Sequence, residues 1–169
     1  QFEYDLSGKL IMKEDKDSKS TYYDYDELGR LKTVTDAMNQ DTQYVYDNRD
    51  NLIQLIDANG QTTWFEYDKN NRLKKEMRPM TQETTYQYNS VGNLVEKVDS
   101  KNQKTEYVYD DVGRLEEIKY FAVATDTVPV KSVSFTYDKV GNLKTYDDST
   151  TSATYVYDDV YRKTSETVD

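Results

Sequence analysis

Apolar and polar residues alternate along this chain in short runs. In Tyr23-Asp24-Tyr25 and Phe65-Glu66-Tyr67 the period is two, which places both rings on the same face of a β-strand. No stretch has apolar residues three or four positions apart for long enough to form an amphipathic helix. The pattern therefore predicts an all-β protein with almost no helix.

The alternating runs belong to one repeated unit, an aromatic residue, any residue, then Tyr and Asp or Asn. The second aromatic of each unit lies at 4, 25, 46, 67, 88, 109, 137 and 157, so that five intervals are 21 residues, one is 28 and one is 20. The aromatic pairs are Phe2 and Tyr4, Tyr23 and Tyr25, Tyr44 and Tyr46, Phe65 and Tyr67, Tyr86 and Tyr88, Tyr107 and Tyr109, Phe135 and Tyr137, and Tyr155 and Tyr157. Since these pairs hold 16 of the 22 aromatic residues, the aromatic content belongs to the repeat.

A tight turn is predicted directly after each pair. An Asp at the first position of a type I turn accepts a backbone N–H bond, and a Gly three residues later can take the positive φ that closes the hairpin. Asp50 and Asn71 replace Gly in two units and also tolerate the left-handed region, whereas Tyr161 in the last unit does not fit this turn. The turn residues are Asp5, Gly8, Asp26, Gly29, Asp47, Asp68, Gly92, Asp110, Gly113, Asp138, Gly141 and Asp158.

A second short strand follows each turn, for example Leu31–Thr35, Leu52–Ile56 and Leu94–Val98. It ends at another turn of the form Asp-x-x-(Gly/Asn), which leads into the next aromatic pair. Each repeat thus contributes two strands and two turns. We expect sixteen strands in a repetitive antiparallel β-hairpin meander that forms a twisted or spiralling sheet.

Residues 1–169 are predicted to form a single array of about eight repeats of ~21 residues. The sixth repeat, 109–136, is longer by seven residues around Phe121–Pro129; we expect a longer hairpin or edge loop, with a contact loop for a partner domain as the alternative. The last repeat, 157–169, is expected to be irregular because of Tyr161 and because Lys163 replaces the usual Leu.

Composition excludes several kinds of function. The chain has no His and no Cys, so it has no Ser-His-Asp triad, Cys nucleophile, His base, N/S zinc site or disulfide. A net charge of -10 argues against binding nucleic acid or an anionic membrane, and the longest apolar run, Tyr120–Ala124, is too short to span a bilayer. The N-terminus, Gln1–Asp5, has no signal-peptide character, and we read the chain as a segment of a longer protein.

The motif Tyr-x-Tyr-Asp-x-x-Gly-Arg-Leu occurs in full at Tyr23–Leu31, with Arg30, and at Tyr107–Leu115, with Arg114. Tyr86–Leu94 and Phe135–Leu143 carry Asn in place of Arg. Eight copies in phase resemble the YD-repeat, or RHS-repeat, family of bacterial polymorphic and wall-associated toxins, toxin-complex proteins and teneurins. The departures are Asp50, Asn71, Tyr161 and the longer sixth repeat.

The resemblance implies a wall segment of a hollow β-shell that encapsulates or presents a toxin or effector domain. It also implies a secreted or cell-surface, wall-associated bacterial protein whose partners are further YD repeats and the C-terminal effector of the same chain. The family's region of self-cleavage, with its Asp-Pro motifs, is absent, so the resemblance carries over no catalytic residue. We expect no enzyme activity, cofactor or metal, and no nucleic-acid partner or membrane insertion.

Other roles remain open from the sequence. The aromatic ladder could be a carbohydrate- or cell-wall-binding adhesive module, although cross-strand stacking of the rings explains it too. The Asp/Asn-rich turns lack the EF-hand calcium pattern, and no pair of carboxylates stands outside the repeat as a glycosidase pair should. The isolated chain could also dimerise through an open sheet edge or face.

Overall fold

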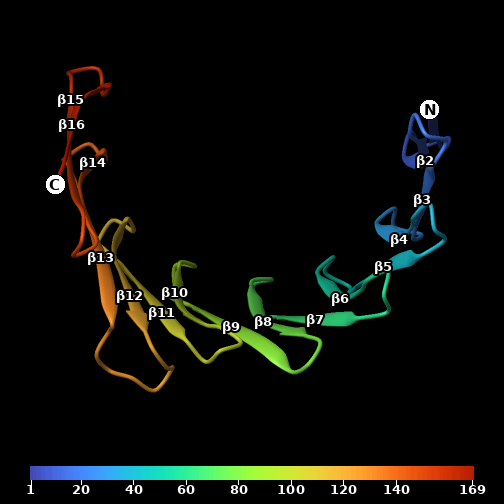
Figure 1. Ribbon diagram of the computed structural model, residues 1–169, viewed down its shortest axis with the longest axis horizontal. Coiled ribbons are helices and arrows are strands. Elements are labelled where there is room, and N and C mark those ends of the chain that lie inside the picture. Colours follow the sequence, from blue (N-terminus) through green and yellow to red (C-terminus); the bar gives the residue numbers. More distant parts are fainter. The chain divides into compact units, whose positions relative to one another are not determined.

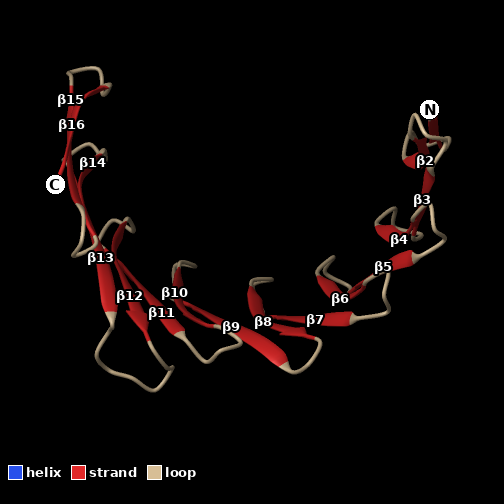
Figure 2. Ribbon diagram, viewed as in Figure 1, coloured by secondary structure: helices blue, strands red, loops and turns tan.

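The computed structural model describes all 169 residues, and they form sixteen β-strands without a helix (Figures 1 and 2). This confirms the all-β prediction and the number of strands. The strands are β1 (Phe2–Tyr4), β2 (Leu10–Glu14), β3 (Ser20–Tyr25), β4 (Leu31–Thr35), β5 (Asp41–Tyr46), β6 (Leu52–Ile56), β7 (Thr62–Tyr67), β8 (Leu73–Arg78), β9 (Gln82–Tyr88), β10 (Leu94–Val98), β11 (Lys104–Tyr109), β12 (Leu115–Phe121), β13 (Lys131–Tyr137), β14 (Leu143–Asp147), β15 (Ser152–Tyr157) and β16 (Lys163–Val168).

The contacts divide the chain into two units, Gln1–Glu83 and Thr84–Asp169. Within the first unit β1 to β8 pair in sequence order, and within the second β9 to β16 do the same. Every pairing is antiparallel, because each connection is a turn that reverses the chain (Figure 1). The expected hairpin meander is therefore the architecture of each unit.

The turn after each aromatic pair, called here the YD turn, has the predicted geometry. In the sixth repeat the N–H of Gly113 donates to the Asp110 carbonyl at 2.9 Å, and the N–H of Asp110 donates to the Arg114 carbonyl at 2.9 Å. Gly113 has a φ of 86°, and Asp50 and Asn71 take φ values of 64° and 59° at the same position. A type I turn followed by one left-handed residue thus closes the YD hairpins, as expected.

The last YD turn corrects one expectation. Tyr161 takes a φ of 64°, and its N–H donates to the Asp158 carbonyl at 2.9 Å, so the turn closes like the others. The β15–β16 pairing is also regular, although every residue of β16 is exposed. The hydrogen bonds of the turn and the pairing of the following strand outweigh the left-handed penalty of about 1–2 kcal/mol at Tyr161.

The turns that join one YD hairpin to the next follow the same rule with three variations. Ser18, Asn39 and Asn102 take φ values of 58–61°, and Gly60 takes 76°. Between β8 and β9 the turn has no Asp cap, and both Met80 and Thr81 are left-handed, with φ values of 62° and 60°. After β14 the turn is one residue shorter, since Asp148 N–H donates to the Thr151 carbonyl, and this accounts for the 20-residue interval. The seven extra residues of the sixth repeat lengthen the β12–β13 connection, which runs over residues 122–130.

Each YD hairpin also contains a β-bulge that the sequence interpretation did not include. Tyr25 pairs with Leu31 and Asp24 pairs with Thr33, so that Lys32 is the extra residue on β4. The register shifts in the same place in all eight hairpins. A bulge changes which residues share a face, and here it turns Leu31 and Val34 to the side of Tyr23 and Tyr25.

The side that carries the rings, called here the ladder face, is covered only in part. Only four hydrophobic side chains in the chain are buried: Met12, Phe121, Val133 and Ala153. Most ladder rings are half-buried, and Phe2 and Tyr4 on β1 are 57% and 60% exposed. Trp64 lies on the opposite side, opposite Gln54 and Met77, as strand alternation predicts. The sheet therefore forms a single layer without an enclosed hydrophobic core.

Candidate functional site

Five ladder tyrosines connect their repeat to the one before it. The Tyr109 hydroxyl donates to the Leu94 carbonyl at 2.9 Å, fifteen residues earlier in the chain. The same bond joins Tyr25 to Leu10, Tyr67 to Leu52, Tyr137 to Leu115 and Tyr157 to Leu143, at 2.8–3.0 Å. These bonds explain why the second aromatic of the motif is Tyr, because Phe has no hydroxyl to donate.

In two repeats the Arg of the motif connects its repeat to the one after it. Arg114 Nε lies 2.7 Å from Asp110 Oδ2 in its own turn, while its Nη1 donates to the Asp138 carbonyl of the next turn at 3.2 Å. Its guanidinium lies 4.7 Å from the centre of the Tyr137 ring, within cation–π range. Arg114 thus bridges two neighbouring YD hairpins.

Arg30 makes the same bridge in the first unit. It contacts Asp26 at 2.7 Å and the Asp47 carbonyl at 3.1 Å, and its guanidinium carbon lies 4.7 Å from the centre of the Tyr46 ring. It also pairs with the Asp50 carboxylate at 2.6 Å. The bridge, which reaches from one repeat to the next, is therefore a recurrent device.

Where Asn replaces Arg, the bridge shortens or is lost. The Asn51 amide donates to Asp47 Oδ2 at 2.9 Å and still reaches Asn71 of the next turn at 3.1 Å. The Asn142 amide donates to Asp138 Oδ2 at 2.9 Å and does not reach the next turn, where Tyr161 stands in place of Gly or Asn.

The turn aspartates act as backbone caps. Asp110 Oδ1 accepts the N–H groups of Val112 and Arg114 at 3.1 and 2.8 Å. The bond from the Arg114 N–H is the largest of the interactions that hold the pKa of Asp110 below its ordinary value. Because their oxygens are engaged in the turn, these carboxylates serve structure.

Several ladder tyrosines have a pKa that is shifted upward by burial. Desolvation raises the pKa of Tyr46, Tyr67 and Tyr107 above the usual value for a phenol. All three side chains are half-buried in the sheet. This supports packing as the main task of the ladder, whereas a sugar platform would need rings laid open at selected repeats.

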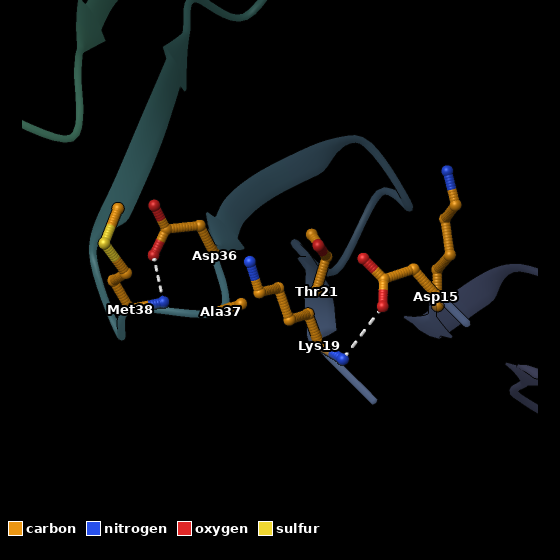
Figure 3. Close-up of a pocket in the computed structure, with 7 residues that line it drawn as sticks. Asp15, Lys19, Thr21, Asp36, Ala37 and Met38 are labelled. Atoms are coloured by element: carbon orange, nitrogen blue, oxygen red, sulfur yellow. Dashed lines mark hydrogen bonds between the residues drawn. The ribbon is translucent and has the colours of Figure 1, made fainter. Parts of the chain in front are cut away.

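The turns that join one YD hairpin to the next leave a groove of about 410 Å³ in the first unit, shown in Figure 3. It is lined by Lys13, Asp15, Lys19, Thr21, Asp36, Ala37 and Met38. The two carboxylates that face it are caps: Asp15 Oδ1 accepts the Lys19 N–H at 3.0 Å, and Asp36 Oδ1 accepts the Met38 N–H at 2.8 Å (Figure 3). The groove brings together no pair of free acidic groups.

No group of three or more Asp or Glu side chains is arranged to hold a metal ion. The structure also contains no helix long and apolar enough to cross a membrane.

The structure places the motif residues named from the sequence in the YD hairpins and brings each aromatic pair beside its neighbours in the sheet. Sequence reasoning missed the bulge, the hydroxyl bonds to the preceding repeat and the arginine bridge. One signal for the bulge was available: Leu31 and Val34, Leu52 and Leu55, and Leu115 and Ile118 are spaced by three residues, where a regular strand would need two.

A sequence profile of the teneurin YD-shell matches residues 1–121, more than two thirds of the chain. The chain belongs to the teneurin YD-shell family. Members of this family are structural shell repeats, and the YD turn, the aromatic pair and the Arg of the motif are its repeated parts here. No curated protein sequence matches the chain.

Solved structures show the same fold for this YD-shell segment. The chain is similar to the crystal structure of TcdB2-TccC3-TEV, with a TM-score of 0.77, 18% identity and coverage of 98% of this chain and 10% of that one. The Photorhabdus luminescens Tc holotoxin pore matches with a TM-score of 0.64 and 16% identity over 98% of this chain and 12% of that one. TcdB2-TccC3-Cdc42 matches with a TM-score of 0.66 and 19% identity over 96% of this chain and 9% of that one. The YD-shell segment thus spans about a tenth of the length of these chains.

Proposed function

We propose that this YD-shell segment is part of the wall of a closed β-shell in a large secreted or surface protein, and that the shell encapsulates or presents a toxin or other effector domain. Its partners are further YD repeats and that effector. The segment contributes structure and carries no catalytic activity of its own.

The observation that carries this proposal is the single layer of the sheet. Only four hydrophobic side chains are buried, and the ladder rings are covered on one side by their neighbours alone. A half-covered apolar face is stabilised when further protein covers it. A shell meets this need, because its wall is one layer thick and its interior can hold another domain.

The wall role and the glycan-binding alternative differ in what the ladder does. We expect replacement of Tyr44 and Tyr46 by Ala to destabilise the chain by about 2 kcal/mol per ring, roughly half the loss typical of a fully buried aromatic. Urea denaturation followed by circular dichroism measures this loss. A glycan array on the folded, unsubstituted chain should show no defined sugar retained. Specific retention that disappears in the Ala variant would contradict a purely structural role.

Encapsulation is tested in the full-length protein that contains this segment. Limited proteolysis should spare the effector domain while the wall is intact. A Tyr109→Ala and Tyr137→Ala variant, which weakens two neighbouring hairpins, should expose the effector to cleavage at lower protease concentrations. Equal cleavage of the effector in both proteins would argue against enclosure and leave the wall fold itself untouched.

A further inference from the structure

The YD hairpins of the second unit contain the same groove twice, once with Arg and once with Asn at its centre. The first copy is lined by Asp110, Arg114, Glu116, Phe135, Thr136 and Tyr137 and has a volume of about 250 Å³. The second includes the equivalent residues Asp138, Asn142, Lys144, Tyr155, Val156 and Tyr157, together with Val140, Asp158, Asp159 and Tyr161, and has a volume of about 510 Å³. The two grooves therefore show what the same site looks like with Arg114 and with Asn142 at its centre.

In the first copy the Arg114 side chain occupies the groove. Its guanidinium lies over the Tyr137 ring at 4.7 Å, with one nitrogen 2.7 Å from Asp110 Oδ2 and another 3.2 Å from the Asp138 carbonyl. The groove between two neighbouring YD hairpins is therefore shaped for a guanidinium. Arg30 makes the equivalent three contacts in the first unit.

In the second copy this occupant is missing. The Asn142 amide ends at Asp138 Oδ2, and the nearest ring-bound cation, Lys163, lies 5.4 Å from the centre of the Tyr155 ring and not over Tyr157. The Tyr157 hydroxyl still donates to the Leu143 carbonyl at 2.9 Å, so the ring is held in the position that Tyr137 has in the occupied groove. The aromatic surface that would receive a guanidinium is therefore present and fixed.

The charges around the open groove favour a cation. Asp138, Asp158 and Asp159 line it, with Lys144 as the one cation of the lining. The Asp138 carboxylate accepts the Asn142 amide and the Asp158 carboxylate is paired with Arg162 at 2.7 Å, so that Asp159 is the acidic group of the lining without such a partner. The Asp158 backbone carbonyl is placed in its turn as the Asp138 carbonyl is. We propose that the groove at Asn142 and Tyr157, called here the guanidinium groove, binds the side chain of an arginine from a basic segment of another polypeptide.

Arginine fits this groove better than lysine. Its planar guanidinium can stack on a ring and donate in two directions at once, as Arg114 does. Lys9, which stands at the same motif position in the first repeat, lies over Tyr25 at the longer distance of 5.2 Å. The proposal goes beyond the wall role and does not depend on it, since it concerns one junction between two hairpins.

The test is an NMR titration of the ¹⁵N-labelled chain with N-acetyl-arginine amide. We expect saturable shifts centred on Asn142, Tyr157 and Asp159, with weak affinity because one cation–π contact and exposed ion pairs contribute little each. The neutral isostere N-acetyl-citrulline amide should bind at least about fivefold more weakly, which corresponds to about 1 kcal/mol.

The decisive variant is Asn142→Arg, which restores the motif of the preceding junction and should fold for that reason. Its own guanidinium should fill the groove and abolish the titration shifts. Asn51→Arg is the matched control: it makes the same change at another junction and should leave the shifts unchanged. Equal binding of the citrulline compound, or unchanged binding by Asn142→Arg, would overturn the proposal, and so would shifts that do not saturate.

Discussion

At the scale of single residues, the motif separates into parts with different tasks. The Asp caps the turn, the residue three positions later supplies the positive φ, and the Tyr hydroxyl reaches back to the preceding repeat. The Arg reaches forward to the next repeat. Each side chain therefore has a partner at a defined distance along the chain, and its loss should have a defined local effect.

The hydroxyl bond predicts the first of these effects. Tyr109→Phe removes the donor to the Leu94 carbonyl and should lower the free energy of unfolding by about 1 kcal/mol. Tyr4→Phe is the control, since Tyr4 is 60% exposed and its hydroxyl has no acceptor in the chain. Urea denaturation measures both. Equal effects of the two substitutions would show that the hydroxyl bond contributes nothing.

At the scale of the element, the YD hairpin requires two backbone features. Its turn needs a left-handed residue, and its bulge sets which residues of the second strand face the ladder. In the last hairpin the left-handed residue is Tyr161, a residue type that disfavours this region. That hairpin should therefore store strain that the Gly-containing hairpins do not.

Replacement of Tyr161 by Gly should relieve this strain and stabilise the β15–β16 hairpin by up to about 1 kcal/mol. Hydrogen exchange of the amides in β15 and β16 measures the change as slower exchange. The reverse substitution, Gly113→Tyr, should cost about 1–2 kcal/mol through its φ of 86°. Steric overlap is a minor factor there, because a Cβ at Gly113 would meet only the Asn93 amide nitrogen, at 3.8 Å. A faster exchange in Tyr161→Gly would refute the strain argument.

At the scale of the whole molecule, stability is distributed over many similar local contacts. The chain has no single hydrophobic core, and neighbouring strands supply most of the cover for each ring. The stability of a repeat array is approximately a sum over repeats and the interfaces between them. Conditions that act on every turn at once should therefore have a large combined effect.

Acid is such a condition. The hydrogen bond from the Ser7 hydroxyl is the main cause of the lowered pKa of Asp5. The hydrogen bond from the Lys19 N–H is the main cause of the lowered pKa of Asp15. A carboxyl whose pKa is lower in the folded chain stabilises it above the unfolded pKa, and this contribution is lost as the pH falls through the folded pKa. Stability should therefore change little from neutral pH down to about pH 5 and then decline steadily below about pH 4.

A double variant isolates this effect. Both side chains accept their turn bonds through Oδ1, an oxygen that Asn retains, and Asn89 already caps a turn in this way. Asp5→Asn with Asp15→Asn should be somewhat less stable than the unsubstituted chain near pH 7, because the neutral amide lacks the charge that strengthens these turn bonds. It should lose less stability between about pH 5 and pH 3, so that the two proteins converge in acid. Thermal unfolding across this range measures the difference. Parallel curves for the two proteins would show that these turn carboxylates do not drive acid unfolding.

The amino-acid sequence alone determined the repeat, the sixteen strands and the positions of the turns. These features are local: an Asp cap and a left-handed residue act within about five positions, and strand alternation needs only the neighbouring residues. Only the tertiary structure decided the bulge after each Leu, the hydroxyl bond to the repeat before and the arginine bridge to the repeat after. It also decided that Tyr161 closes its turn and that Asn142 leaves a groove open before Tyr157. The bulge and the closure of the Tyr161 turn depend on backbone hydrogen bonds within one hairpin, which outweigh the preference of the single residue. The hydroxyl bond, the arginine bridge and the open groove depend on the register between hairpins of neighbouring repeats, which the sequence of one repeat does not specify.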